Sequence, residues 1–151
     1  MPDQATERTT IDATPARCLE AALAFDSYPI WAHDIKETEV LERDDEGRGT
    51  QVRFRAAAMG RSTTYILGYD YREAPRKLSW KLLDSDITRQ VDGSYDFAPV
   101  PGDPDRTDVT YQLAVELVVP LPSFVKRRAE SRIMHTALRE LKAWVERSPV
   151  A

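Results

Sequence analysis

The sequence predicts one α+β domain, a curved antiparallel sheet of about seven strands wrapped around a long C-terminal helix, with two short helices after the first strand. Between residues 36 and 119 apolar and polar side chains alternate, which is the period of strands. From residue 122 to 147 apolar side chains recur every three or four positions, as in an amphipathic helix. The 151 residues, with 42% apolar and 30% charged side chains, are typical of a single compact domain over residues 1–151.

The composition excludes several kinds of site. Cys18 is the only cysteine and His33 and His135 are the only histidines, so the chain offers neither an internal disulfide nor a CxxC or HExxH zinc site. The GxGxxG, GxxxxGK(S/T) and GxSxG patterns, which bind dinucleotides, bind phosphates or present a nucleophilic serine, do not occur either. We therefore expect no metal and no cofactor.

The apolar runs of the chain are short. The run from Leu113 to Pro122 is interrupted by Glu116 and falls below the roughly 20 residues that cross a bilayer. The first residues lack the basic and apolar segments of a secretory signal. A cytoplasmic location is the expectation from these two observations.

Charge is distributed unevenly along the chain. The net charge of −4 argues against binding to nucleic acid, which normally requires a basic surface. Residues 126–147 nevertheless carry seven basic and three acidic side chains. The basic face of this helix is either simply solvated or makes a transient contact with a membrane surface. The oligomeric state is expected to be a monomer or a homodimer.

The N-terminal segment predicts a strand and two short helices. Residues 6–11 are polar and rich in threonine, as in an extended strand. Thr14 followed by Pro15 is the pattern of an N-cap and a first helical residue. The aromatic segment from Phe25 to Trp31 predicts a second helical turn, and Pro29 prevents the first helix from continuing through it.

Six further strands are predicted by alternation between turn-forming residues. Gly60-Arg61 predicts a tight hairpin turn, and residues 98–107 predict a longer, proline-containing loop. Gly68 and Gly93 are expected to mark bulges or close contacts within strands. The predicted strands are 36–43, 50–58, 63–72, 78–83, 87–97 and 108–119, and the final helix follows from Pro122 to Arg147.

The element order and three local motifs resemble a known superfamily. The motifs are Tyr28-Pro29-x-Trp31, the segment 91–97 and the segment 120–127. They resemble the polyketide cyclase/dehydrase and lipid-transport branch of the START/Bet v 1-like (SRPBCC) superfamily over nearly the whole chain. The resemblance implies the helix-grip fold and functions that range from aromatase/cyclases to coenzyme Q chaperones, because fold and activity are only loosely tied.

A bent sheet closed by one long helix favours a concave, mostly apolar cavity for a ligand. The alternation places one set of side chains on the face toward this cavity. We expect the ligand to be bound by Trp31, Phe54, Tyr65, Tyr69, Trp80, Arg89, Tyr95, Tyr111, Met134 and Leu138, with further lining from Val52, Leu67, Leu78, Val91 and Leu113.

Two groups of polar side chains are candidates within that cavity. Each tyrosine offers a hydroxyl that either bonds a ligand oxygen or lies at the rim of an ordinary core. Arg89 shares the apolar register with Val91, where a guanidinium needs an anionic or carbonyl partner. The alternative for Arg89 is a strand-end side chain that reaches solvent or pairs with Asp86 or Asp92.

Three functions remain open on the sequence. The first is a carrier or binding protein for a hydrophobic or aromatic small molecule such as a lipid, a quinone or a polyketide-like compound. The resemblance implies the second, a cofactor-independent polyketide cyclase/aromatase in which Arg89, Tyr65 and Tyr69 orient and protonate a poly-ketone. The third is an interaction module with a filled core. No histidine or carboxylate is evident in the cavity as a general base, which favours binding over catalysis.

Overall fold

The computed structural model describes residues 5–58, 61–86, 88–117 and 122–147. The chain begins with strand β1 (Ala5–Ile11), helix α1 (Pro15–Leu23), the short 3-10 helix η1 (Phe25–Ser27) and helix α2 (Tyr28–Trp31). Six strands and a long helix follow, as predicted: β2 (Ile35–Arg43), β3 (Gly49–Ala58), β4 (Arg61–Asp70), β5 (Lys77–Ser85), β6 (Thr88–Val100), β7 (Asp103–Leu117) and α3 (Ser123–Arg147).

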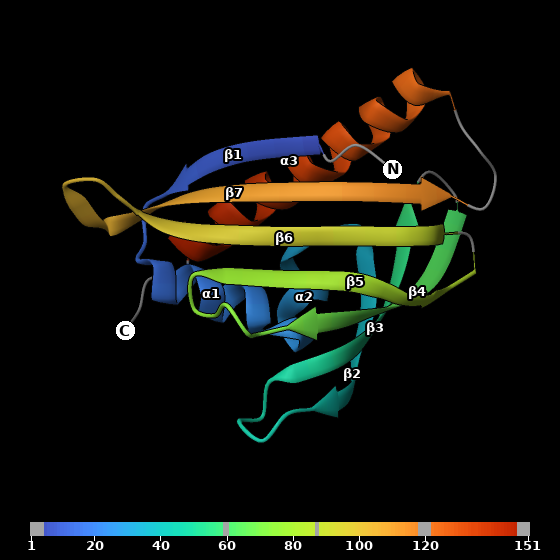
Figure 1. Ribbon diagram of the computed structural model, residues 1–151, viewed down its shortest axis with the longest axis horizontal. Helices are drawn as coiled ribbons and strands as arrows, with labels where there is room; N and C mark the ends of the chain where they lie inside the picture. The colour runs from blue at the N-terminus through green and yellow to red at the C-terminus, as the bar shows by residue number, and fades with distance from the viewer. Residues whose placement is uncertain (1–4, 59–60, 87, 118–121, 148–151) are drawn as a thin grey trace.

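The seven strands form one antiparallel sheet in the order β1-β7-β6-β5-β4-β3-β2. Consecutive strands from β2 to β7 are neighbours, and β1 joins the far edge beside β7. Register shifts between β2 and β3, between β4 and β5 and between β6 and β7 add local bend and twist. Figure 1 shows the result, in which the sheet bends along β4, so that β2 runs across the direction of β6 and β7. The predicted curved sheet of a helix-grip fold is therefore confirmed.

The two short helices are held by local hydrogen bonds. Oγ1 of Thr14 accepts a bond from the backbone N–H of Arg17 at 3.3 Å, and Pro15 occupies the first turn of α1. Ala24 leaves the helical conformation with a ψ of 69°, so the chain changes direction before α2. The Tyr28 hydroxyl then donates to the Ala22 carbonyl at 2.5 Å, which ties α2 to α1.

The prediction of a long loop between the last two strands is wrong. Residues 98–100 continue β6 and residues 103–107 belong to β7, so the connection is a tight turn at Pro101 and Gly102. Gly102 has a φ of 79°, which glycine adopts without steric cost. Pairing across the hairpin outweighs the prolines that suggested a loop. Gly60 of the other predicted turn lies outside the described residues, as do Val118 and Val119 of the predicted last strand.

Helix α3 is about 38 Å long at ~1.5 Å per residue and crosses the sheet beside β1 and β7. The carbonyl of Pro122 accepts from the backbone N–H groups of Val125 and Lys126 and so opens the helix. Further along, Nζ of Lys142 donates to the Thr10 carbonyl at 2.6 Å. None of the helices in the described part of the chain has the length and apolar content that a membrane span requires.

Glu130 connects α3 to the edge of the sheet. Its side chain is only 3% exposed, and its Oε2 accepts a bond from the backbone N–H of Val115 at 2.9 Å. Val115 lies two residues beyond Leu113, which pairs with Ala5, the first described residue of β1. The carboxylate therefore satisfies a backbone donor of β7 that lies beyond the last pair formed by the described residues of β1.

Replacing Glu130 with alanine is expected to lower the free energy of unfolding by about 1–3 kcal/mol, because a buried N–H loses its acceptor. Glu130→Gln keeps a side-chain acceptor and should cost less. Urea denaturation followed by circular dichroism measures both. Glu20→Ala, at an exposed carboxylate on α1, is the control, and an equal effect of Glu20→Ala and Glu130→Ala would contradict the role of Glu130.

Candidate functional site

The space between the sheet and the helices is filled largely by rings. Trp80 of β5 lies at its centre, with ring centroids 5.1 Å from Tyr95 and 5.7 Å from Tyr111. Phe25 extends the packing toward the short helices, 4.8 Å from Tyr69. We call this set the aromatic interior, and it consists of Phe25, Tyr28, Trp31, Phe54, Tyr65, Tyr69, Trp80, Tyr95, Phe97 and Tyr111.

Nine of the ten predicted ligand-binding residues lie in this region of the structure. Met134 and Leu138 face it from α3 and are buried. Tyr65 and Tyr69 are half-buried against the core. The other five are buried in the core cluster: Trp31, Phe54, Trp80, Tyr95 and Tyr111.

Arg89 is placed differently from the expectation that it is buried. Its side chain is exposed, and a register shift between β6 and β7 falls between Thr88 and Gln90. The shift interrupts the alternation that put Arg89 in phase with Val91. Arg89 therefore follows the other expectation, in which its side chain reaches solvent. Arg89 therefore does not join Tyr65 and Tyr69 in the aromatic interior.

Three aromatic side chains of the interior were not on the predicted list. Phe97 is two positions beyond Tyr95 on the same face of β6, so the alternation contained its signal. Phe25 and Tyr28 come from η1 and α2, where segments of three and four residues give no usable period. Only the packing of these short helices over β3 and β4 brings the two rings inside.

Four tyrosine hydroxyls of the interior have no hydrogen-bond partner among the described residues. In contrast, the hydroxyl of Tyr28 donates to Ala22 and that of Tyr71 donates to Gly49. A buried hydroxyl normally finds a partner, because an unmade hydrogen bond inside a protein is costly. The four unpaired hydroxyls belong to Tyr65, Tyr69, Tyr95 and Tyr111.

These hydroxyls are not fully enclosed by protein atoms. Within the described residues, Trp31 Nε1 and Thr50 Oγ1 are the unpaired side-chain polar atoms that are also fully enclosed. The four hydroxyl oxygens are not of that kind, so each keeps accessible surface. Tyr65 and Tyr69 are also partly accessible although protein atoms surround them. A hydroxyl oxygen with accessible surface can bond a ligand atom or a water that reaches it.

Burial determines the protonation of the four tyrosines. Loss of hydration raises the pKa of Tyr65 to about 12, with a smaller contribution from the negative charge of Asp34. The same loss of hydration, reinforced by neighbouring phenol groups, raises the pKa of Tyr69, Tyr95 and Tyr111 well above the ordinary value. At neutral pH all four are therefore hydrogen-bond donors and acceptors, and none is a base.

The carboxylates that α3 buries are engaged in structural contacts. Glu130 accepts from Val115, as described above, and Oε2 of Glu140 lies 2.7 Å from Nδ1 of His33 and 3.3 Å from its backbone nitrogen. The His33 side chain itself is exposed. Residues 5–58, 61–86, 88–117 and 122–147 contain no group of three or more candidate ligands that could hold a metal.

Cys18 is buried in α1 beside Thr107. Burial raises the pKa of its thiol, and the hydrogen bond with Thr107 and the charge of Arg17 offset only part of this effect. A thiol that is inaccessible and protonated is a poor nucleophile.

Two open depressions lie mainly on the opposite, outer face of the sheet. The larger has a volume of about 870 Å³ and the smaller about 330 Å³, and both include Lys77, Ser94 and Gln112. Ser94 and Gln112 point away from the core because they alternate with Tyr95 and Leu113. These depressions are open, and most of the residues that line them are polar or charged, unlike those of the aromatic interior.

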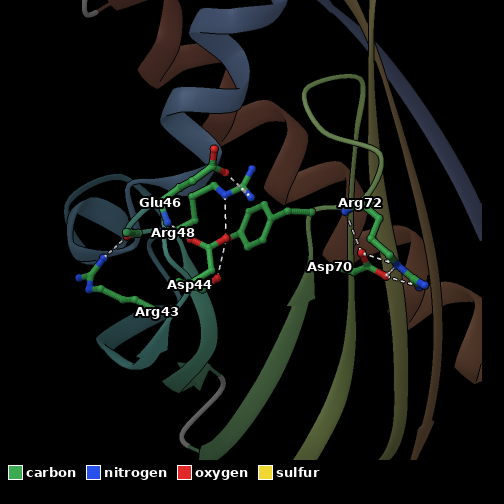
Figure 2. A network of polar contacts seen from close by, with 9 residues as sticks. Arg43, Asp44, Glu46, Arg48, Asp70 and Arg72 are labelled. Atoms are coloured by element: carbon green, nitrogen blue, oxygen red, sulfur yellow. Dashed lines mark hydrogen bonds and ion pairs between the residues drawn. The ribbon is translucent and has the colours of Figure 1, made fainter.

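A network of charged side chains borders the larger depression (Figure 2). Nε of Arg48 lies 2.9 Å from Oδ2 of Asp44, and its guanidinium stacks 4.5 Å above the Tyr71 ring. Asp70 and Arg72 form a separate pair at 2.6 Å. Because these charges are matched to one another, the network holds the β2–β3 turn against the end of β4.

Comparison with known proteins agrees with this architecture. The family described as polyketide cyclase / dehydrase and lipid transport matches residues 3–146. A START superfamily protein from Mycobacterium smegmatis has a TM-score of 0.89 at 22% identity, covering 95% of this chain and 97% of that one. The Zhui aromatase/cyclase from Streptomyces sp. R1128 has a TM-score of 0.82 at 16% identity, covering 97% and 95%. Comparison with curated proteins gives no significant match.

Proposed function

The chain belongs to the polyketide cyclase/dehydrase and lipid transport family, and we propose that it binds a hydrophobic or aromatic small molecule between the sheet and α3 as a carrier or binding protein. The observation that carries the proposal is the set of four tyrosine hydroxyls in the aromatic interior that have no partner among the described residues. An apolar lining with a few polar groups is the usual composition of a small-molecule site.

The chemistry of the lining indicates what such a ligand contains. Rings such as Trp80 and Phe54 favour a flat or extended apolar body. Protonated hydroxyls on Tyr69 and Tyr111 favour carbonyl or hydroxyl oxygens on that body. Quinones, polyphenols and polyketide-like compounds combine the two features. A lipid with an oxygenated head does so as well.

Native mass spectrometry of the freshly purified, untagged protein is the direct test, followed by organic extraction of whatever is released. A stoichiometric lipid, quinone or polyphenol would support the proposal and identify the compound to study. The same spectrum gives the oligomeric state. Protein that is wholly free of ligand would count against a constitutive carrier.

A matched pair of probes tests the hydroxyls themselves. Naphthoquinone should quench the tryptophan fluorescence at lower concentration than naphthalene, which lacks the oxygens. Tyr69→Phe or Tyr111→Phe should weaken naphthoquinone binding by roughly two- to ten-fold, the value of one hydrogen bond, and leave naphthalene binding unchanged. Tyr71→Phe is the control, because its hydroxyl bonds Gly49 outside the aromatic interior. Equal affinity for the two probes in every variant would contradict the proposal.

The cyclase alternative is supported by one observation. Tyrosines that stay protonated well above neutral pH are able to donate a hydrogen bond to a carbonyl oxygen as negative charge develops on it in the transition state. The expected participation of Arg89 does not follow from its exposed position. Incubation with a poly-ketone substrate separates the two functions, because a cyclase gives turnover that Tyr69→Phe reduces, whereas a carrier returns the compound unchanged.

A further inference from the structure

We propose that the first turns of α3 bind the surface of an anionic lipid bilayer. The surface in question, the docking face, consists of two adjacent rows along the helix: Phe124, Arg128 and Arg132 in one, and Val125, Ala129 and Ile133 in the other. Residues four apart in a helix lie on the same side, and all six of these are exposed. The inference does not depend on what the aromatic interior binds.

The apolar side chains of the docking face are not used by the core. Phe124 is 71% exposed, Val125 36% and Ile133 47%. The core positions of α3 begin later and on the other side of the helix, with Met134, Leu138 and Leu141. Figure 1 shows the first turns of α3 at the upper right, rising beyond β1. Phe124, Val125 and Ile133 are spread over about half of the helix circumference, on the side turned away from the core, and exposed large apolar side chains there mark a surface that meets something.

The charge of the docking face favours an anionic partner. Arg128 and Arg132 lie in the row of Phe124, and the acidic side chain of this segment, Glu130, is buried against Val115. The docking face is thus positive, although the chain as a whole carries −4. Apolar and basic side chains on the same helical surface fit a bilayer, where rings and aliphatic groups enter the interface and arginines meet anionic head groups.

The docking face is presented by the folded protein without rearrangement. The Glu130–Val115 bond and the contact of Ser131 Oγ with Glu7 Oε1 at 3.3 Å hold the underside of the same turns to the sheet. The acidic remainder of the protein is repelled by an anionic surface, which favours contact through this end alone. The expected attachment is therefore peripheral, oriented and weakened by salt.

Sedimentation of the full chain with lipid vesicles tests the proposal. Binding is expected to vesicles of equal parts phosphatidylcholine and phosphatidylglycerol, and not to phosphatidylcholine alone. Arg128→Gln with Arg132→Gln should weaken binding roughly 25-fold, because each cation near such a surface contributes about five-fold. Phe124→Ser with Ile133→Ser should weaken it at least ten-fold. The double variant Leu41→Ser with Arg106→Gln, exposed sites outside α3, should bind as the wild type does.

Several results would overturn the proposal. They are absence of vesicle binding by the wild type, equal binding to both kinds of vesicle, and variants of the docking face that bind like the control. Sedimentation equilibrium tests the competing occupant, a second copy of the chain. If Phe124→Ser abolishes a concentration-dependent dimer and vesicles are not bound, the docking face is a dimer contact instead. Thermal unfolding verifies that each variant is folded, and unchanged naphthoquinone binding by them separates this surface from the interior.

Discussion

Replacement of Gly93 with alanine is expected to lower the free energy of unfolding by about 3 kcal/mol, at the upper end of the cost of overpacking a core. Gly93 pairs directly with Trp80 across β5 and β6. A Cβ atom at this position would lie 2.4 Å from both Cε2 and Nε1 of the indole, far inside van der Waals contact. Trp80 has little room to move, because Tyr69, Tyr95 and Tyr111 surround it.

A second glycine offers a matched control for this prediction. Gly68→Ala places its Cβ 3.1–3.3 Å from the side chain of Leu83, which is 48% exposed and free to adjust. Its cost should be below ~1 kcal/mol in the same urea denaturation experiment. Trp80→Phe introduced into the Gly93→Ala protein should recover part of the loss, since the smaller ring makes room. Equal stabilities of the two glycine variants would refute the steric argument.

Alkaline unfolding is the second large effect expected. Burial raises the pKa of all six tyrosines in the folded protein, five of them in the aromatic interior, whereas in the unfolded chain each titrates near its ordinary value of about 10. Their contribution to stability is therefore fully present below about pH 10 and is lost as the pH rises toward the folded values. Each contributes a slope of ~1.4 kcal/mol per pH unit in that window, so the five together remove about 7 kcal/mol per pH unit, which is comparable to the stability of a typical domain, about 5–15 kcal/mol. The five are Tyr28, Tyr65, Tyr69, Tyr95 and Tyr111.

The measurement is the urea midpoint as a function of pH, together with tyrosinate absorbance. We expect cooperative unfolding just above about pH 10, with most of the tyrosinate signal appearing in the same transition. Tyr111→Phe distinguishes tyrosines from lysines, because it removes one buried phenol and should lower the slope by ~1.4 kcal/mol per pH unit. At neutral pH the same substitution should change stability little, since no described residue bonds that hydroxyl. Tyrosinate absorbance that rises while the protein stays folded would contradict the burial argument.

Local patterns were sufficient to predict most of the elements. The start of α1 depends on Thr14 and Pro15, whose capping chemistry acts within one turn. The inward faces of β3 to β7 follow from an alternation that each strand carries in itself. The full length of the β6–β7 hairpin was not predicted. Residues 98–107 carry proline and glycine signals that are typical of a loop, and only cross-strand pairing overrides them.

The candidate site also contains residues that the sequence predicted and residues that it did not. The aromatic lining could be predicted because side chains alternate between the two faces of a strand. The apolar set on each strand therefore identifies its buried face. Arg89 could not be placed, since the register shift beside it depends on how β6 meets β7. The rings of Phe25 and Tyr28 also depended on tertiary contacts of short helices. Exposure of Phe124, in turn, depends on where α3 leaves the sheet.

The sequence by itself determined the order of the elements, the apolar face of each and the resemblance to the family, because capping, alternation and helical spacing are properties of neighbouring residues. Only the tertiary structure decided the exposure of Arg89, the close approach of Trp80 to Gly93 and the four hydroxyls left without partners. Each of these depends on atoms brought together from distant parts of the chain, and strand register, ring packing and hydrogen-bond supply are set at that level.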